Sequence, residues 1–255
     1  MHSIGILGVG ELTEKVVRGL RHGGHTGAIF LSPRNRQRAS ALRDQFDCQV
    51  MPDNQALVER SSVVILGVRP DVVAQLAGEV SLGADKILIS LVAGMDSSAL
   101  AQRFPEATVV RAMLSYAAEI NATTVVTYPD NGAARKLLAP LGTFIALQDE
   151  SAFEVATVAA CMNGWFYFWL HDLQRWFVDQ GLPHAQARQL VLSNLQDCLA
   201  SARHNPDTDL ETMGNAIATP GTFTRQGLDV LRERQVSAPW TAAFDSVLLE
   251  LGREG

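Results

Sequence analysis

The sequence contains few cysteines and lacks a long uninterrupted apolar run. Its three cysteines, Cys48, Cys161 and Cys198, are widely spaced and odd in number, which excludes a disulfide framework and a paired-cysteine metal motif. We therefore expect no metal site and a reducing compartment, the cytoplasm. The longest apolar stretch, residues 156–170, is too short to cross a bilayer and contains Asn163, so the sequence predicts no transmembrane segment.

Basic charge is also scarce. The chain carries 21 basic and 27 acidic residues, a formal net charge of -6, and has no dense Lys/Arg tract. Nucleic acids and anionic membrane surfaces need a concentrated basic face, so we expect neither as a partner. Apolar residues are plentiful, because 47% of the 255 residues are hydrophobic. This is enough for the core of one large domain or two moderate ones.

The first turn of the chain has the pattern of a nucleotide-binding βα turn. Residues 3–7 form an apolar run of strand length, Gly8 and Gly10 follow, and a helical pattern begins at about Glu11 and Leu12. Gly8 allows a sharp turn, Gly10 allows the backbone to approach a pyrophosphate, and the free amides at the start of the helix attract its charge. We predict that these four residues bind the pyrophosphate of a dinucleotide.

That pattern alone leaves an alternative open. Two glycines after a strand are common, and the third small position of the motif, usually Gly or Ala, is here Thr13. The alternative is a tight turn that binds no ligand.

The residues after the second predicted strand indicate which dinucleotide binds. A site that prefers NAD carries Asp or Glu at this point to accept hydrogen bonds from the ribose hydroxyls. This chain instead has the donors Ser32, Arg34 and Asn35, and no acid that would repel a 2′-phosphate. We therefore predict NADP, with NADPH as the reduced form. The alternative is that Arg34, Arg36 and Arg38 only form the solvated start of a helix.

Strands alternate with helices as far as residue 149. Such alternation predicts an α/β fold with a parallel, doubly wound sheet of Rossmann type, so we assign residues 1–149 to a dinucleotide-binding domain. Ligands of these sheets lie outside the carboxyl ends of the strands. One crevice should therefore be lined by Gly8, Ser32, Val68, Ala93 and Met113, which follow or end successive strands. After the first strand, the predicted strands are 28–31, 49–51, 63–68, 86–91, 108–113, 123–128 and 144–147.

From residue 150 onward the pattern is helical, and residues 150–255 are assigned to an all-α domain. Its first helix carries seven of the chain's 17 aromatic residues, which point in all directions because consecutive positions rotate around a helix. One partner surface cannot cover them, so we predict a homodimer through the helical domain. A monomeric core helix is the alternative. The seven residues are Trp165, Phe166, Tyr167, Phe168, Trp169, Trp176 and Phe177.

Five short motifs follow one another along the chain. They are Gly8-x-Gly10, Val68-Arg69-Pro70, Val109-Val110-Arg111-Ala112-Met113, Gly181-Leu182-Pro183 and Thr219-Pro220-Gly221-x-x-Thr224. In this order they resemble pyrroline-5-carboxylate reductase, and the resemblance spans almost the whole chain. In that family a Rossmann domain is joined to an all-helical dimerisation domain, and the active site lies between the cofactor of one subunit and helical residues of its partner. The resemblance adds Arg69 and Pro70 to the expected cofactor contacts.

The resemblance also implies substrate contacts, although the motifs that carry them are altered. Thr224 stands where the family binds the substrate carboxylate, with plain helix capping as the alternative. The family's Met-Pro-Asn-Thr-Pro segment beside the nicotinamide is here Met113-Leu114-Ser115-Tyr116-Ala117. We predict Thr224, Ser115 and Tyr116 as the catalytic set, with packing as the alternative role of Tyr116. The family's Ser-Gly-Ser-x-Pro-Ala-Tyr segment is here Ala159-Ala160-Cys161-Met162-Asn163-Gly164-Trp165, which loses two hydroxyls and a proline.

The function predicted from these residues is hydride transfer from NADPH to the C=N carbon of a small imine, either pyrroline-5-carboxylate or a related cyclic imine carboxylate. One alternative is a carbonyl reductase like the β-hydroxyacid dehydrogenases. That family relies on a catalytic Lys in its helical half, and residues 150–255 contain no Lys. The other alternative is a non-catalytic NADP(H)-binding sensor or regulator, which the altered substrate motifs would permit.

Overall fold

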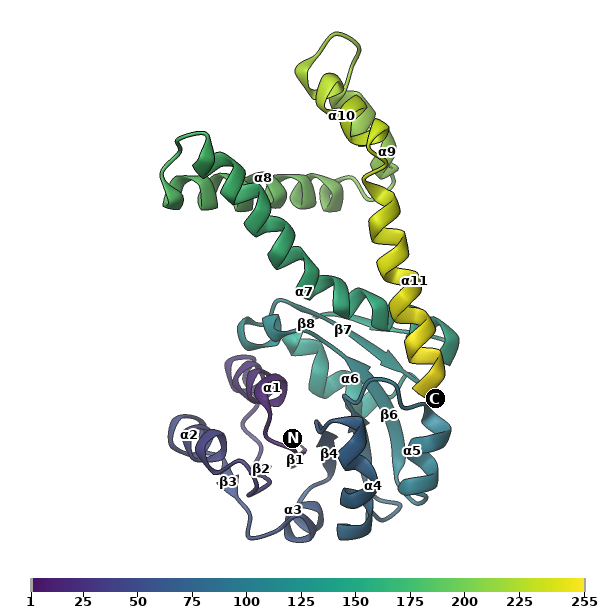
Figure 1. The fold of residues 1–255 in the computed structure, drawn as a ribbon. Helices are drawn as coiled ribbons and strands as arrows, with labels where there is room; N and C mark the ends of the chain where they lie inside the picture. Colours follow the sequence, from purple (N-terminus) through teal and green to yellow (C-terminus); the bar gives the residue numbers. More distant parts are fainter. Residues whose placement is uncertain (1, 255) are drawn as a thin grey trace. The chain divides into compact units, whose positions relative to one another are not determined.

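The computed structural model describes residues 2–254, which form two compact units. Unit 1 consists of the residues up to Ala160 together with those from Val247 onward, and unit 2 is Cys161–Ser246. Figure 1 labels the elements of both units. The domain boundary predicted after residue 149 coincides with the start of helix α7 (Glu150–Asp179), whereas the compact units divide within that helix, after Ala160.

Unit 1 is built on an eight-stranded sheet with the strand order β3-β2-β1-β4-β5-β6-β7-β8. Strands β1 to β6 are parallel, and the chain moves outward from β1 to β3 on one side and from β4 to β6 on the other. This confirms the predicted α/β fold of Rossmann type. The strands are β1 (Ile4–Leu7), β2 (Ile29–Leu31), β3 (Gln49–Val50), β4 (Val63–Leu66), β5 (Ile87–Ser90), β6 (Thr108–Met113), β7 (Thr123–Tyr128) and β8 (Gly142–Ala146).

The far edge of the sheet departs from the predicted all-parallel arrangement. β7 runs antiparallel to β6, while β8 runs parallel to β7. The connection from β6 to β7 contains only the short 3₁₀ helix η1 (Tyr116–Ile120). A parallel crossover needs a dozen or more residues, so this shorter connection reverses the strand direction.

The central strands carry buried apolar side chains on both faces of the sheet. Helices therefore cover both faces. Ile4, Ile6 and Ile65 contribute to one core cluster with α1 and α2, whereas Leu7 and Leu66 contribute to the other with α3 and α4. The helices of unit 1 before α7 are α1 (Glu11–His22), α2 (Arg36–Phe46), α3 (Asn54–Arg60), α4 (Pro70–Glu79), α5 (Ser97–Arg103) and α6 (Gly132–Leu138), followed by the 3₁₀ helix η2 (Ala139–Leu141).

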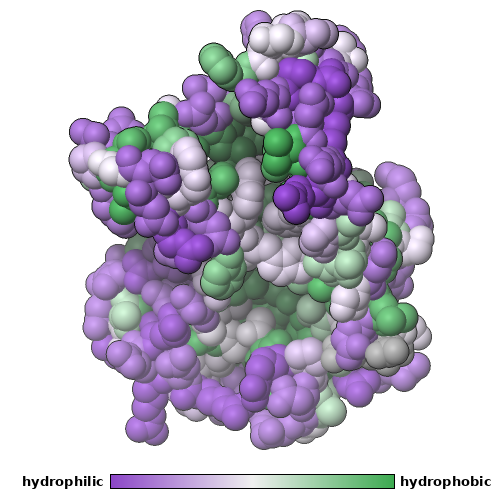
Figure 2. Space-filling model, turned by 45° about the horizontal axis from the view of Figure 1, so that its top comes forward, coloured by the Kyte–Doolittle hydropathy of each residue, from purple (hydrophilic) through white to green (hydrophobic). Residues whose placement is uncertain are grey.

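Unit 2 is helical, as predicted, and has almost no core of its own. Within Cys161–Ser246 only Ala187, Val191 and Ala218 are buried, and Figure 2 shows apolar surface exposed on one face of the molecule. None of the helices among residues 2–254 is long and apolar enough to cross a membrane. Besides α7, the helices are α8 (His184–His204), α9 (Leu210–Ile217), α10 (Phe223–Glu233) and α11 (Ser237–Glu254), the last of which continues into unit 1.

Candidate functional site

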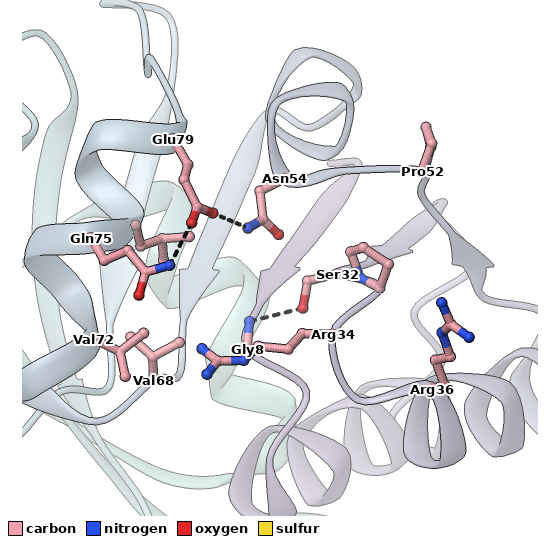
Figure 3. A pocket seen from close by; sticks show the side chains of 12 residues that line it. Gly8, Ser32, Arg34, Arg36, Pro52, Asn54, Val68, Val72, Gln75 and Glu79 are labelled. Atoms are coloured by element: carbon pink, nitrogen blue, oxygen red, sulfur yellow. Dashed lines mark hydrogen bonds between the residues drawn. The ribbon is translucent and has the colours of Figure 1, made fainter.

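A pocket of about 420 Å³ opens at the carboxyl ends of β1, β2 and β4, where the strand order of the sheet reverses. This is the position at which doubly wound sheets bind ligands. Four of the predicted cofactor residues line it, namely Gly8, Ser32, Arg34 and Val68. Figure 3 shows these residues around the pocket. The other lining residues are Pro33, Arg36, Pro52, Asn54, Val72, Gln75, Leu76 and Glu79.

Gly8 makes the turn that opens the pocket. Its φ of +93° lies in the region that favours glycine, and a Cβ at this position would lie 2.5 Å from the Cγ1 of Val68. The amide of Gly8 donates to the hydroxyl of buried Ser32 at 3.1 Å, a contact drawn in Figure 3. The ends of β1 and β2 are thereby tied together at the pocket.

Thr13, the residue that departs from the usual motif, stabilises the same turn. Its hydroxyl accepts a hydrogen bond from the amide of Gly10 at 2.8 Å and lies 2.8 Å from the carbonyl oxygen of Gly8, to which it donates. The side chain is buried. A threonine therefore fits the third small position because its hydroxyl bonds to the backbone of the turn.

The start of α1 has the space and the donors that an anion requires. Side chains cap α2, α3, α5 and α6, but α1 has no side-chain cap because its N-cap residue is Gly10. The amides of Glu11 and Leu12 have no carbonyl one turn earlier to bond to. Gly10 has an extended backbone, and a Cβ there would meet only the carbonyl oxygen of Gly67, at 3.9 Å. The turn itself does not require glycine at position 10, so this open space fits a phosphate group.

The cations beside the pocket divide into two kinds. Arg34 and Arg36 are exposed, line the pocket and make no ion pair with residues 2–252, whose side chains the structure describes. Arg38 instead forms an ion pair with Glu14 on α1. Partial burial acts to raise the pKa of Glu14, but hydrogen bonds from Arg38 and Arg18 outweigh it, so this pKa lies below its usual value. Arg34 and Arg36 therefore remain available to an anion, while Arg38 joins α1 to α2.

Asn35, a predicted cofactor residue, makes contacts to the backbone. Its Nδ2 donates to the carbonyl of Val9 at 3.0 Å, and its Oδ1 accepts from the amide of Arg38 at 3.3 Å. The side chain thus caps α2 and supports the opening turn.

Several predicted cofactor residues do not line the pocket. Arg69 is the N-cap residue of α4, and its exposed guanidinium pairs with Asp71 at 3.3 Å, while Pro70 is the first residue of that helix. Ala93 is exposed in the segment after β5, and Met113 is half-buried at the end of β6. Their roles toward a cofactor stay predictions.

Sequence reasoning missed one side of the pocket. Gln75 and Glu79 on α4 and Asn54 at the start of α3 line it. Glu79 accepts hydrogen bonds from both amides, each at 2.9 Å. The spacing of Val72, Gln75, Leu76 and Glu79 marks one face of a helix, but the sequence alone does not show that this face borders the pocket.

A buried arginine was also missed. Arg111 on β6 is 1% exposed, pairs with Glu150 at 2.8 Å and with Glu154, and lies over the ring of Phe153 at 4.5 Å. Ser97 on α5 donates its amide and its hydroxyl to the same Glu150 carboxylate, each at 2.7 Å. This cluster fixes the start of α7 against the end of β6, from which the predicted nicotinamide segment continues.

The two predicted catalytic residues of unit 1 differ in the hydrogen bonds and the exposure of their side chains. The hydroxyl of Ser115 lies 3.1 Å from that of Thr123 and accepts from the amide of Ala117 at 3.3 Å. Tyr116 is 49% exposed at the start of η1. The serine therefore supports the β6–β7 connection, and the tyrosine ring remains accessible.

Thr224, in unit 2, lies in the first turn of α10 and is not its cap. The N-cap is Thr222, whose hydroxyl accepts from the amide of Arg225 at 3.2 Å. The capping alternative for Thr224 is therefore wrong. Thr224 lines an apolar pocket between α9 and α10, and the neighbouring Phe223 is 93% exposed.

Comparisons with known proteins identify the same two parts of the chain. Residues 3–94 match the model of the NADP oxidoreductase family described as coenzyme F420-dependent, and residues 150–250 match the pyrroline-5-carboxylate reductase dimerisation domain. Over nearly its whole length, the chain is similar to pyrroline-5-carboxylate reductases. These similar proteins include the pyrroline-5-carboxylate reductase of Vibrio alginolyticus, 24% identical over 92% of this chain and 90% of that protein, and that of Thermus thermophilus, 26% identical over 95% of each.

Solved structures of pyrroline-5-carboxylate reductases have the same fold as this chain. The Plasmodium falciparum pyrroline carboxylate reductase, crystallised with NADP bound, has a TM-score of 0.89 at 17% identity and covers 100% of this chain and 98% of its own. The Streptococcus pyogenes 1-pyrroline-5-carboxylate reductase has a TM-score of 0.85 at 22% identity and covers 98% of each chain. A reductive aminase from Aspergillus terreus, in complex with NADPH4, is less similar, with a TM-score of 0.59 at 19% identity and coverage of 100% and 95%.

Proposed function

We propose that this protein is an NADPH-dependent reductase that transfers hydride to the C=N carbon of pyrroline-5-carboxylate or a related cyclic imine carboxylate. The observation that carries the proposal is the pocket at the sheet's switch point. Arg34 and Arg36, which form no ion pair with residues 2–252, line this pocket and provide a site for a 2′-phosphate. The start of α1, which has no side-chain cap, and the open space at Gly10 follow Gly8 in the chain and provide a site for a pyrophosphate. The reductases to which the chain is related support the same reaction.

The chain's residues act mainly by binding and orientation. NADPH supplies the hydride when it is bound. Gly8 and Gly10 hold the backbone close to the pyrophosphate, and Arg34 and Arg36 hold the 2′-phosphate. A protonated imine is already electrophilic, so the protein needs chiefly to place its carbon against the nicotinamide and to exclude water. Thr224 binds the substrate carboxylate, and Ser115 and Tyr116 lie on the nicotinamide side.

The protein works as a homodimer assembled through unit 2. Apart from three small or medium side chains, no residue of Cys161–Ser246 is buried, while Tyr167, Phe168 and Trp176 are 68%, 75% and 58% exposed. Exposed apolar surface of this extent is typical of an obligate interface. The match to a dimerisation domain over residues 150–250 supports this assignment.

The experiment that tests the function follows the NADPH absorbance band with purified protein and a panel of substrates. The panel contains pyrroline-5-carboxylate, a six-membered and a sulfur-containing cyclic imine carboxylate, and ketones as controls. We expect NADPH oxidation with one or more of the imines and none with the ketones. Oxidation with ketones alone would favour the carbonyl reductase alternative. Tight NADPH binding without turnover of any imine would favour a sensor.

A further inference from the structure

One side of the nucleotide pocket carries a negative charge that the binding of phosphates does not explain. The carboxylate of Glu79 lines the pocket and forms no ion pair with a cationic side chain of residues 2–252. It is held in place by two amides, since Oε2 accepts from Nδ2 of Asn54 and Oε1 accepts from Nε2 of Gln75. A carboxylate repels a polyanionic group, so this side of the pocket suits a part of the ligand that is uncharged and donates hydrogen bonds.

We propose that Glu79, positioned by Asn54 and Gln75, recognises the 6-amino group of the adenine in NADPH. The inference rests on the proposed function and adds a residue that determines which base the site accepts. An ionised carboxylate only accepts hydrogen bonds, and each oxygen of Glu79 uses one acceptor position on an amide. The remaining acceptor positions suit an amino group. The amide nitrogens of Asn54 and Gln75 each keep a second hydrogen, which suits the ring nitrogen beside it.

The rest of the pocket suits the other parts of the adenosine 2′-phosphate group. Val68, Val72 and Leu76 supply apolar contact for the faces of a base. Arg34 lies near Gly8, and the Glu79–Asn54 pair lies away from it, as Figure 3 shows. The adenosine 2′-phosphate part of NADPH combines an anionic group, an apolar ring and a donor in one molecule. The pocket offers a partner for each of these three features.

The same chemistry predicts rejection of a base with a carbonyl group at that position. Hypoxanthine carries an oxygen acceptor where adenine carries its amino group, so a carboxylate that faces this atom meets a lone pair instead of a donor. A site built to bond a donor disfavours an analogue that lacks it, because its own polar groups are left unpaired. Glu79 therefore discriminates between NADPH and its deamino analogue, nicotinamide hypoxanthine dinucleotide phosphate.

The test measures the Kd of both dinucleotides by quenching of tryptophan fluorescence, for the full-length wild type and for Glu79→Gln. We expect the wild type to bind deamino-NADPH about tenfold more weakly, the effect of one hydrogen bond to a charged group. We expect Glu79→Gln to bring the ratio of the two Kd values close to one, mainly through weaker binding of NADPH. A Gln at position 79 offers one acceptor and one donor, so it no longer distinguishes the two bases.

A matched control is available on α3. Gln55 donates to Glu59 at 3.1 Å over the same four-residue spacing as Gln75 and Glu79, and neither Gln55 nor Glu59 lines the pocket. Glu59→Gln should keep the wild-type Kd ratio. Equal affinities in the wild type, or an unchanged ratio in Glu79→Gln, would overturn the inference. A variant that weakens both dinucleotides by the same factor would show that Glu79 only joins α3 to α4. If the wild type bound neither dinucleotide, the result would contradict the proposed function itself, and not only the role of Glu79.

Discussion

The side chain of Thr13 on α1 fills the space next to Gly67, the residue after β4, because a Cβ at position 67 would overlap the Cγ2 of Thr13. The hydroxyl of the same threonine holds the opening turn through Gly8 and Gly10. A β-branched residue therefore fits at position 13 only if position 67 is a glycine. Residues far apart in the sequence thus compensate each other.

This relationship predicts that Gly67→Ala destabilises the fold and that Thr13→Ser restores it. Overpacking of a buried site costs about 1–3 kcal/mol in the free energy of unfolding. Serine removes the Cγ2 and keeps the hydroxyl, so the double variant should recover most of that loss. Urea denaturation of the wild type, both single variants and the double variant gives the coupling energy. Additive effects of the two substitutions would contradict the steric relationship.

The sequence predicts the fold well because strand and helix periods are local properties. Strands such as residues 108–113 and 123–128 were predicted to the residue. It predicts less of the site, because a site depends on which helix faces meet. The sequence places Arg34 and Arg38 in one basic cluster, but only tertiary packing pairs Arg38 with Glu14 and leaves Arg34 without an ion pair among the described side chains. The carboxylate of Glu79 was missed for the same reason.

Gly10→Ala should separate binding from folding. The extended backbone at this position accepts any residue and the added methyl group meets no protein atom closer than 3.9 Å, so stability should change by at most about 1 kcal/mol. The same methyl group would occupy the space assigned to the pyrophosphate, so NADPH affinity should fall about tenfold or more. Isothermal titration and thermal unfolding measure the two effects. Gly8→Ala is the contrast, because its positive φ and its contact with Val68 should make it unstable. Wild-type NADPH binding by Gly10→Ala would place the ligand elsewhere.

Arg34→Ala should reduce the preference for NADPH over NADH. The wild type is expected to bind NADPH more tightly, since Arg34 forms no ion pair within residues 2–252 and the 2′-phosphate is the only charge that distinguishes the two dinucleotides. The substitution should weaken NADPH binding about tenfold and leave NADH binding nearly unchanged. Arg43→Ala is the control, because Arg43 on α2 is exposed, pairs with Asp44 and does not line the pocket. Equal affinities for the two dinucleotides in the wild type would contradict the assignment.

The Glu150 carboxylate should make the free energy of unfolding depend on pH in the acidic range. Partial burial acts to raise its pKa, but hydrogen bonds from the Ser97 side chain, the Arg111 guanidinium and the Ser97 amide outweigh it, so the pKa lies below its usual value of about 4.5. A carboxyl group with a lowered pKa in the folded state stabilises the fold above its unfolded pKa and loses this contribution as the pH falls through the folded value. Glu150→Gln should therefore lower stability at pH 7 and flatten the decline below about pH 4.5.

Urea denaturation at a series of pH values and one fixed protein concentration measures this effect. Glu106→Gln is the control, because Glu106 is exposed and forms no ion pair with the residues that the structure describes. Its curve should follow that of the wild type. A decline of equal steepness in Glu150→Gln would show that the Arg111 cluster does not contribute to the acid sensitivity.

We expect the protein to be a homodimer because unit 2 lacks a hydrophobic core that could stabilise it alone. Only Ala187, Val191 and Ala218 are buried in this helical segment. Light scattering at micromolar concentration should give about twice the chain mass of 27.6 kDa. Phe168, which is 75% exposed on α7, should be covered in the dimer, so Phe168→Glu should shift the protein toward monomers or reduce its helicity, because a buried unpaired charge is costly. Circular dichroism separates these two results. A monomeric, fully helical wild type would refute the dimer, and unchanged dimerisation of Phe168→Glu would exclude this face of α7 from the interface.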